Sequence, residues 1–205
     1  MSALIRSRAF LLLVVAIAVV LSIWTVLALN CPNAGIALTE RARNLHRLKN
    51  RTKLPELADF EPGITLESLL RSGDDRNRWT NQRAARLQGE VIDVAYARPE
   101  AANCFNPCRR DVHILIAKEK NAAKREQVVL EISPLLMDLV ASEGGDWSEP
   151  SLQAKLVGHW CEFEGWLYFD VGHAAEAENT AAGNPENWRA TAWEIHPVTN
   201  ITVIR

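Results

Sequence analysis

The residues best suited to chemistry form three pairs of an acid and a nearby histidine. The pairs are Asp111 with His113, Asp170 with His173, and Glu194 with His196. Residues two apart in a strand share one face, so the first and third pairs can each present a carboxylate beside an imidazole. Such groups suit a divalent metal ion, or a general base that a carboxylate orients. The competing interpretation is structural, because hydrogen bonds between histidine and carboxylate also pin loops.

These pairs define the candidate polar site. The candidate catalytic residues are Glu194 and Asp170, and the candidate metal ligands are His113, His173, His196 and Asp170. A divalent metal is the one cofactor that these side chains suggest. The sequence has no nucleophile motif and no phosphate-binding loop, which favours a binding protein over an enzyme.

Four aromatic residues are candidates for ligand binding: Trp160, Trp166, Tyr168 and Trp188. The first three alternate with apolar residues along 160–170, so they lie on the face opposite the predicted core. Exposed aromatics on a barrel can stack on bases or sugar rings. Alternatively, the long 171–192 connection covers them, with Trp188 as its lid.

Cys104 and Cys108 bracket an Asn-Pro turn that can bring their side chains together. In an oxidising compartment this spacing predicts a disulfide between them. Two alternatives remain: the pair are thiolate ligands of a metal site with His113 nearby, or both are free thiols. Cys161 falls on the apolar face of a strand and is expected to be buried.

Five segments show the alternation of half-buried strands. They are 87–96, 111–117, 127–133, 160–170 and 193–204, with helical material between the third and fourth. Three strands, one helix and two strands is the order of the OB-fold, a small barrel. We therefore expect a mostly β, OB-fold-like five-stranded barrel that bends at Gly89 and Gly165, in preference to a β-sandwich.

Residues 9–29 contain only two polar side chains and are long enough to cross a bilayer. They predict an uncleaved anchor rather than a cleaved signal peptide. The expected organisation is a cytoplasmic end and transmembrane helix at 1–30, a stalk with a short helix at 31–83, and the barrel at 84–205. Basic residues flank both sides of the anchor, so orientation rests on export-like cysteine usage. We expect a bacterial inner-membrane protein with its C-terminal domain outside the cytoplasm.

Charge is unevenly distributed along the chain. Residues 1–83 hold 12 basic and 7 acidic side chains, whereas 84–205 hold 11 and 18. An acidic folded part repels phosphate backbones, so nucleic-acid binding is not expected to be the main function. The basic stretch 41–53 can contact anionic lipid headgroups or act as a solvated spacer.

The segments 165–170, 177–180 and 187–199, together with His173, resemble a family of uncharacterised bacterial OB-like proteins. The most specific part is the run Trp-Glu-Ile-His-Pro-Val-Thr at 193–199, and the resemblance covers roughly 85–204. It implies a shared domain without an activity to transfer, and it singles out Asp170, His173, Glu194 and His196.

The first functional hypothesis is a membrane-tethered, non-enzymatic module that binds a protein or envelope ligand on the surface of the fourth and fifth strands. The second is a metal-dependent hydrolase that uses the three histidines with Asp170 or Glu194. The third is OB-type binding of single-stranded nucleic acid through Trp160, Trp166 and Tyr168.

Overall fold

The computed structural model describes residues 10–20, 22 and 31–205. Residues 10–20 are helical, and residues 9, 21 and 23–29 of the predicted anchor 9–29 lie outside the described residues. Within the described ranges, no helix combines the length and apolar character that a bilayer crossing requires.

The core of the molecule is a closed five-stranded barrel, which confirms the predicted barrel. Around it the strands follow the order β1-β2-β3-β5-β4; β3 and β5 are parallel, and the other neighbours are antiparallel. The strands are β1 (Ala84–Tyr96), β2 (Val112–Ala117), β3 (Val128–Ile132), β4 (Trp160–Phe169) and β5 (Trp193–Val203).

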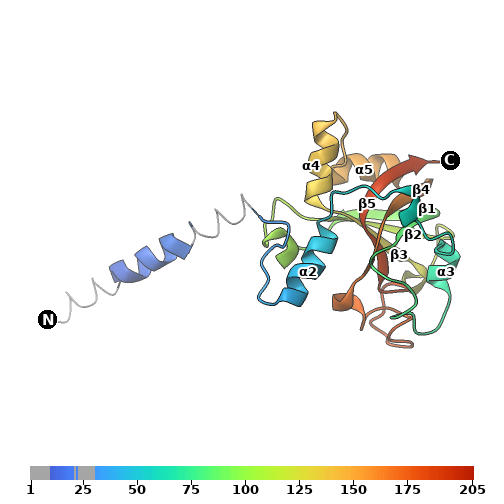
Figure 1. The fold of residues 1–205 in the computed structure, drawn as a ribbon, viewed down its shortest axis with the longest axis horizontal. Helices are drawn as coiled ribbons and strands as arrows, with labels where there is room; N and C mark the ends of the chain where they lie inside the picture. The colour runs from blue at the N-terminus through green and yellow to red at the C-terminus, as the bar shows by residue number, and fades with distance from the viewer. Residues whose placement is uncertain (1–9, 21, 23–30) are drawn as a thin grey trace.

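Helical segments surround the barrel (Figure 1). The α-helices are α2 (Glu40–Lys49), α3 (Leu66–Leu70), α4 (Pro134–Ser142) and α5 (Glu149–Leu156). Short 3-10 turns are η1 (Leu57–Asp59), η2 (Ala101–Asn103), η3 (Lys124–Glu126) and η4 (Val171–His173). The single helix expected between β3 and β4 is therefore two, because Gly144, at a φ of +83°, follows the end of α4 and α5 begins afresh with Pro150 in its first turn.

The barrel interior is apolar and follows the predicted alternation. Ile114, Leu130, Phe163 and Ile195 are fully buried in it, and the residues beside them in the chain face outward. The expected bend at Gly165 is present, since the pairing register of β4 and β5 shifts there. A side chain at this position would meet the carbonyl oxygen of Pro197 at 2.3 Å, so the two backbones can approach only at glycine.

The segment 31–83 packs on the barrel along much of its length. Two of its helices are capped at their N-termini, since the Thr39 side chain accepts a hydrogen bond from Ala42 N and that of Thr65 accepts one from Ser68 N. Ile64, Leu66 and Leu69 join the apolar core. Trp79 packs edge-on against Trp193 at 5.7 Å between ring centroids.

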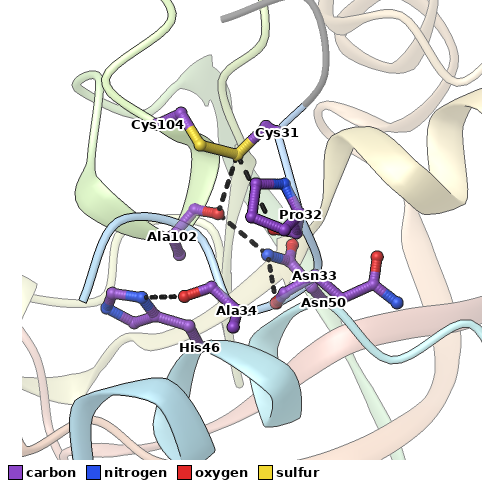
Figure 2. Close-up of a disulfide and its surroundings, with 8 residues drawn as sticks. All are labelled: Cys31, Pro32, Asn33, Ala34, His46, Asn50, Ala102 and Cys104. Carbon is purple, nitrogen blue, oxygen red and sulfur yellow. Dashed lines mark hydrogen bonds between the residues drawn. A yellow bond between two sulfur atoms is a disulfide. The ribbon is translucent and has the colours of Figure 1, made fainter. Parts of the chain in front are cut away.

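The predicted disulfide between Cys104 and Cys108 is wrong. Cys104 is bonded to Cys31, 73 residues away, and Cys108 is an exposed free thiol (Figure 2). The Cα atoms of Cys31 and Cys104 are 5.8 Å apart, a normal disulfide separation, and the side chain of Cys104 is fully buried. Spacing along the chain identified a neighbouring partner, whereas the fold supplies a distant one. Cys161 is a buried thiol, as predicted.

The disulfide holds the start of the 31–53 segment against the loop between β1 and β2. Beside it, the Asn50 amide donates to the carbonyl oxygens of Ala102 and Asn33, and His46 Nδ1 lies 2.8 Å from Ala34 O (Figure 2). The C-terminal end of α2 is thereby fixed over the outer face of the barrel.

Candidate functional site

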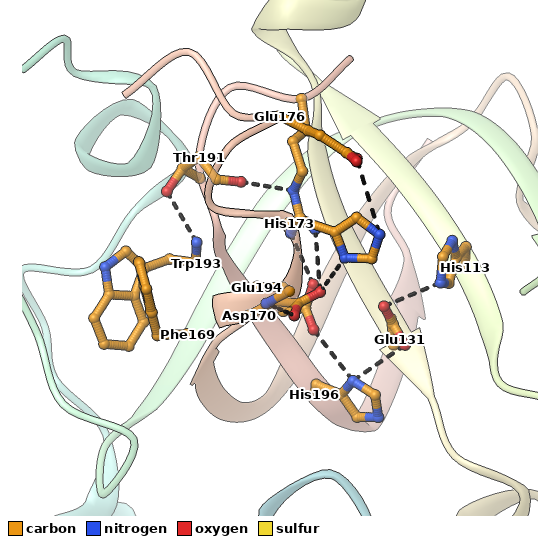
Figure 3. Close-up of polar contacts among 12 residues, drawn as sticks. His113, Glu131, Phe169, Asp170, His173, Glu176, Thr191, Trp193, Glu194 and His196 are labelled. Atoms are coloured by element: carbon orange, nitrogen blue, oxygen red, sulfur yellow. Dashed lines mark hydrogen bonds and ion pairs between the residues drawn. The ribbon is translucent and has the colours of Figure 1, made fainter. Parts of the chain in front are cut away.

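A buried polar network lies on the outer face of the barrel where β2, β3 and β5 are neighbours (Figure 3). Glu131 on β3 is its centre. One carboxylate oxygen, Oε1, is 3.0 Å from His113 Nε2 on β2, its partner in the strand register. The other, Oε2, is 3.1 Å from His196 Nδ1 on β5. Because Leu130 pairs with Ile195 in the core, the residues flanking that pair share the opposite face.

The network continues from His196 toward the loop that follows β4. His196 Nδ1 is also 3.2 Å from Glu194 Oε1. Arg189 then joins two acids, because its Nη2 is 2.7 Å from Glu194 Oε2 and its Nη1 is 3.7 Å from Asp170. Asp170 Oδ2 in turn lies 2.5 Å from His173 Nδ1.

Lys49, the last residue of α2, brings a positive charge to the same face. Its Nζ is 2.6 Å from Glu100 Oε2 and lies over the Tyr168 ring at 5.9 Å from the centroid. Burial opposes the charge on this ammonium, but Glu131 and Glu100 outweigh burial and raise the pKa of Lys49 well above its usual value.

The environment separates the protonation states of these groups. Burial raises the pKa of Glu131, yet His113, His196 and Lys49 lower it well below the usual value, so Glu131 is ionised. Burial and the charge of Glu131 raise the pKa of Glu194 to about 8. Burial lowers the pKa of His196 to about 4, so this ring is neutral at pH 7. We assign it the Nδ1–H tautomer, because Nδ1 faces two carboxylates and Nε2 has no partner among the described residues.

The two histidines nearer the surface behave in the opposite way. Burial opposes the charge on His113, but Glu131 raises its pKa. For His173 the hydrogen bond with Asp170 is the main cause, and its pKa is raised as well. In Asp170 burial raises the pKa, but the bond with His173 and the charge of Arg189 bring it down to about 2. Glu131 and Asp170 therefore each face a histidine that favours the imidazolium form.

A cleft of about 550 Å³ opens onto this network. Its walls come from the loop between β1 and β2, from His113 and Glu131, and from the loop between β4 and β5. The lining residues include Lys49, Arg98, Glu100, His173, Glu176 and Trp188. The volume is within the usual range for small-molecule sites.

The predicted site residues fall into two groups. The structure brings His113, His173, His196, Asp170 and Glu194 into one network, and Trp188 lines the same cleft beside His173 at 5.5 Å between ring centroids. Trp166 and Tyr168 are buried under residues 49–53, with Trp166 Nε1 donating to Lys53 O at 2.7 Å. The expected cover by the 171–192 loop is wrong for these two rings. Trp160 lies apart, at the start of β4, under the Arg205 guanidinium.

Two sets of acids and histidine could offer ligands to a metal ion. They are Asp111, Glu131 and His196, and Glu131, Asp170 and Glu194, with ligand atoms within 4.8 Å of one another in each set. Arg189, however, already pairs with Glu194 and Asp170, and the charge of Lys49 acts on Glu131. The donor set therefore fits an internally compensated network better than a divalent ion.

Sequence reasoning missed four members of the site: Lys49, Glu100, Glu131 and Arg189. Glu131 could have been identified from the sequence. It is a charged residue in an otherwise apolar strand, and the alternation places it on the face that points away from the core. Lys49, Glu100 and Arg189 lie outside the strands, and only the tertiary fold brings them in. Among known proteins, no family model and no curated protein matches the chain.

Proposed function

We propose that the chain is an OB-fold module that binds a small polar ligand in the cleft beside Glu131. Support for the OB-fold comes from the strand order β1-β2-β3-β5-β4, with the helical insertion between β3 and β4. The observation that carries the binding function is the position of the cleft. It lies between the β1–β2 and β4–β5 loops and next to the β2–β3 face, where OB-folds take their ligands.

Binding rather than catalysis is favoured because most polar groups of the network already bond to one another. Both oxygens of Glu131 are engaged, and His173 is oriented by Asp170. Such a network holds its side chains in fixed positions before a ligand arrives, which reduces the entropy lost on binding.

The module is proposed to be tethered to the bacterial inner membrane by residues 9–29, with the barrel outside the cytoplasm. The apolar run in the sequence supports the tether. The Cys31–Cys104 disulfide supports an oxidising compartment. Contact of residues 41–53 with anionic headgroups stays a prediction, and Lys49 and Arg51 in this stretch are engaged by the barrel.

A metal-dependent hydrolase is the second candidate, because of the two acid-containing sets around Glu131. It requires the purified chain to retain a divalent ion in stoichiometric amount. Elemental analysis, together with the change in melting temperature on adding Mn²⁺ or Zn²⁺, decides this point. Single-stranded nucleic acid is disfavoured, since Trp166 and Tyr168 are covered and cannot stack on bases.

The test of the binding proposal is a screen of the full chain, in detergent, against a panel of polar compounds. The panel holds neutral sugars, sugar acids, amino acids and nucleotides, and binding is followed by NMR. Compounds that bind should shift the resonances of the Trp188 indole, and Trp188→Ala should weaken their binding. The matched variant Trp160→Ala, away from the cleft, should leave binding unchanged. Shifts confined to other surfaces, or no binding from any compound, would refute the proposal.

A further inference from the structure

The hydrogen-bond acceptors that line the cleft are mostly bonded or buried within the protein. Glu131 receives His113 on one oxygen and His196 on the other. Glu100 Oε2 accepts a hydrogen bond from Lys49, and its Oε1 is buried, with no hydrogen-bond partner among the described residues. Burial and the neighbouring Glu100 raise the pKa of Asp111 well above its usual value. A ligand that offers only donors would find few free acceptors here.

Glu176 is the partial exception among the acids that line the cleft. Its Oε2 accepts a hydrogen bond from Trp188 Nε1 at 2.5 Å. The same oxygen is 4.0 Å from His173 Nε2, which is beyond hydrogen-bond distance. One glutamate oxygen therefore remains for a ligand donor.

The donors of the cleft, in contrast, are largely unused. Arg98 is exposed and makes no ion pair or hydrogen bond with the residues that the structure describes. His113 is bound through Nε2, and its Nδ1 has no partner in that part of the chain. His173 is bound through Nδ1, and its Nε2 has only the 4.0 Å ion pair with Glu176, so it can still donate a hydrogen bond. These three groups come from the β1–β2 loop, from β2 and from the turn after β4.

This imbalance defines what the ligand must bring. We infer that the ligand of the cleft carries a carboxylate or phosphate group, which Arg98, His113 and His173 bind together. The inference rests on the proposed function and adds a chemical class to it. Anionic oxygens accept several charge-assisted hydrogen bonds at once, and guanidinium and imidazolium groups are their usual partners. Trp188 borders the same space, and 550 Å³ accommodates a molecule of monosaccharide size.

Three matched probes separate the possibilities: glucuronate, glucose 6-phosphate and glucose. They share one ring and differ in carrying a carboxylate, a phosphate or no charge. Calorimetric titration of the full chain should show at least one anionic probe binding 10-fold or more tightly than glucose. Arg98→Ala should weaken the binding of that anionic probe about 10-fold and leave the affinity for glucose unchanged. Arg125→Ala, which removes a surface charge outside the cleft, is the control and should have no effect.

The outcomes distinguish this inference from the proposal on which it rests. Preference for glucuronate or for glucose 6-phosphate supports the inference and identifies the anion. Equal binding of glucose, with shifts at Trp188, overturns the anionic class and leaves the cleft as the binding site. If no probe binds, or if Arg98→Ala leaves the affinity of a folded protein unchanged, the inference fails. Circular dichroism of each variant establishes that it is folded.

Discussion

Two buried carboxylates in this molecule, Asp75 and Glu131, have very different surroundings. Asp75 Oδ2 accepts hydrogen bonds from Asn179 and Thr191, and its backbone oxygen accepts one from the Trp193 indole. These partners do not titrate, and Asp75 is fully buried. Asp75 therefore joins the segment 31–83 to the β4–β5 loop and to β5.

Glu131 instead contacts two histidines and lies near a lysine, and its neighbourhood opens onto a cleft. The difference teaches that a buried acid is not by itself a sign of function. Neutral partners and a closed environment indicate a structural role. Titratable partners and access to solvent indicate a site.

The largest expected effect is on Glu131. Glu131→Gln leaves Lys49 and His113 without their shared negative charge, and unpairing buried charges costs roughly 3–5 kcal/mol of unfolding free energy. Urea unfolding at pH 7 measures this loss. Glu162→Gln, a surface carboxylate, should cost less than about 1 kcal/mol. Equal costs for the two variants would remove the distinction between network and surface.

The second effect is at Asp75. Asp75→Ala leaves the buried donors of Asn179 and Thr191 unpaired, which should lower the unfolding free energy by about 3 kcal/mol. Binding of any cleft ligand should survive in the folded fraction. Asp74→Ala, at the exposed neighbour, is the control and should have little effect. A ligand affinity that falls with Asp75→Ala as much as with Trp188→Ala would contradict the structural role.

The third effect is the pH dependence of stability from His196. Its folded pKa of about 4 lies below the unfolded value of 6.5, so the unfolded state binds a proton first. The contribution of neutral His196 to stability is complete above pH 6.5 and is lost as the pH falls to about 4. The loss is about 3 kcal/mol. Thermal and urea unfolding of His196→Gln should show a correspondingly smaller loss over this range, and identical profiles would disprove a neutral His196.

The smallest effect concerns Asp170. Its folded pKa of about 2 lies below the usual value of 3.8, so its contribution to stability is present above pH 4 and disappears as the pH falls toward 2. Asp170→Asn should be about 2 kcal/mol less stable than the natural chain at pH 5. The difference should shrink at pH 2. A difference that is the same at both pH values would show that Asp170 does not act through its charge.

The strands and the acid–histidine pairs were accessible from the sequence, because alternation along 111–117, 127–133 and 193–204 reports which side chains share a face. The sequence could not predict that these pairs converge, since their convergence depends on the parallel pairing of β3 with β5. The Cys31–Cys104 bond and the position of Lys49 depend on how 31–53 folds back onto the barrel. Contacts of this kind leave no periodic signal in the chain.

The most direct test follows the imidazole resonances of His113, His173 and His196 by NMR at pH 6.5. The ligand added to the full chain is glucuronate or glucose 6-phosphate, whichever binds more tightly. The two histidines that line the cleft should shift together and saturate, and His196, sealed behind Glu131, should not move. A response at His196 without one at His113 or His173, or no response at any of them, would contradict the assignment of this network as a ligand site.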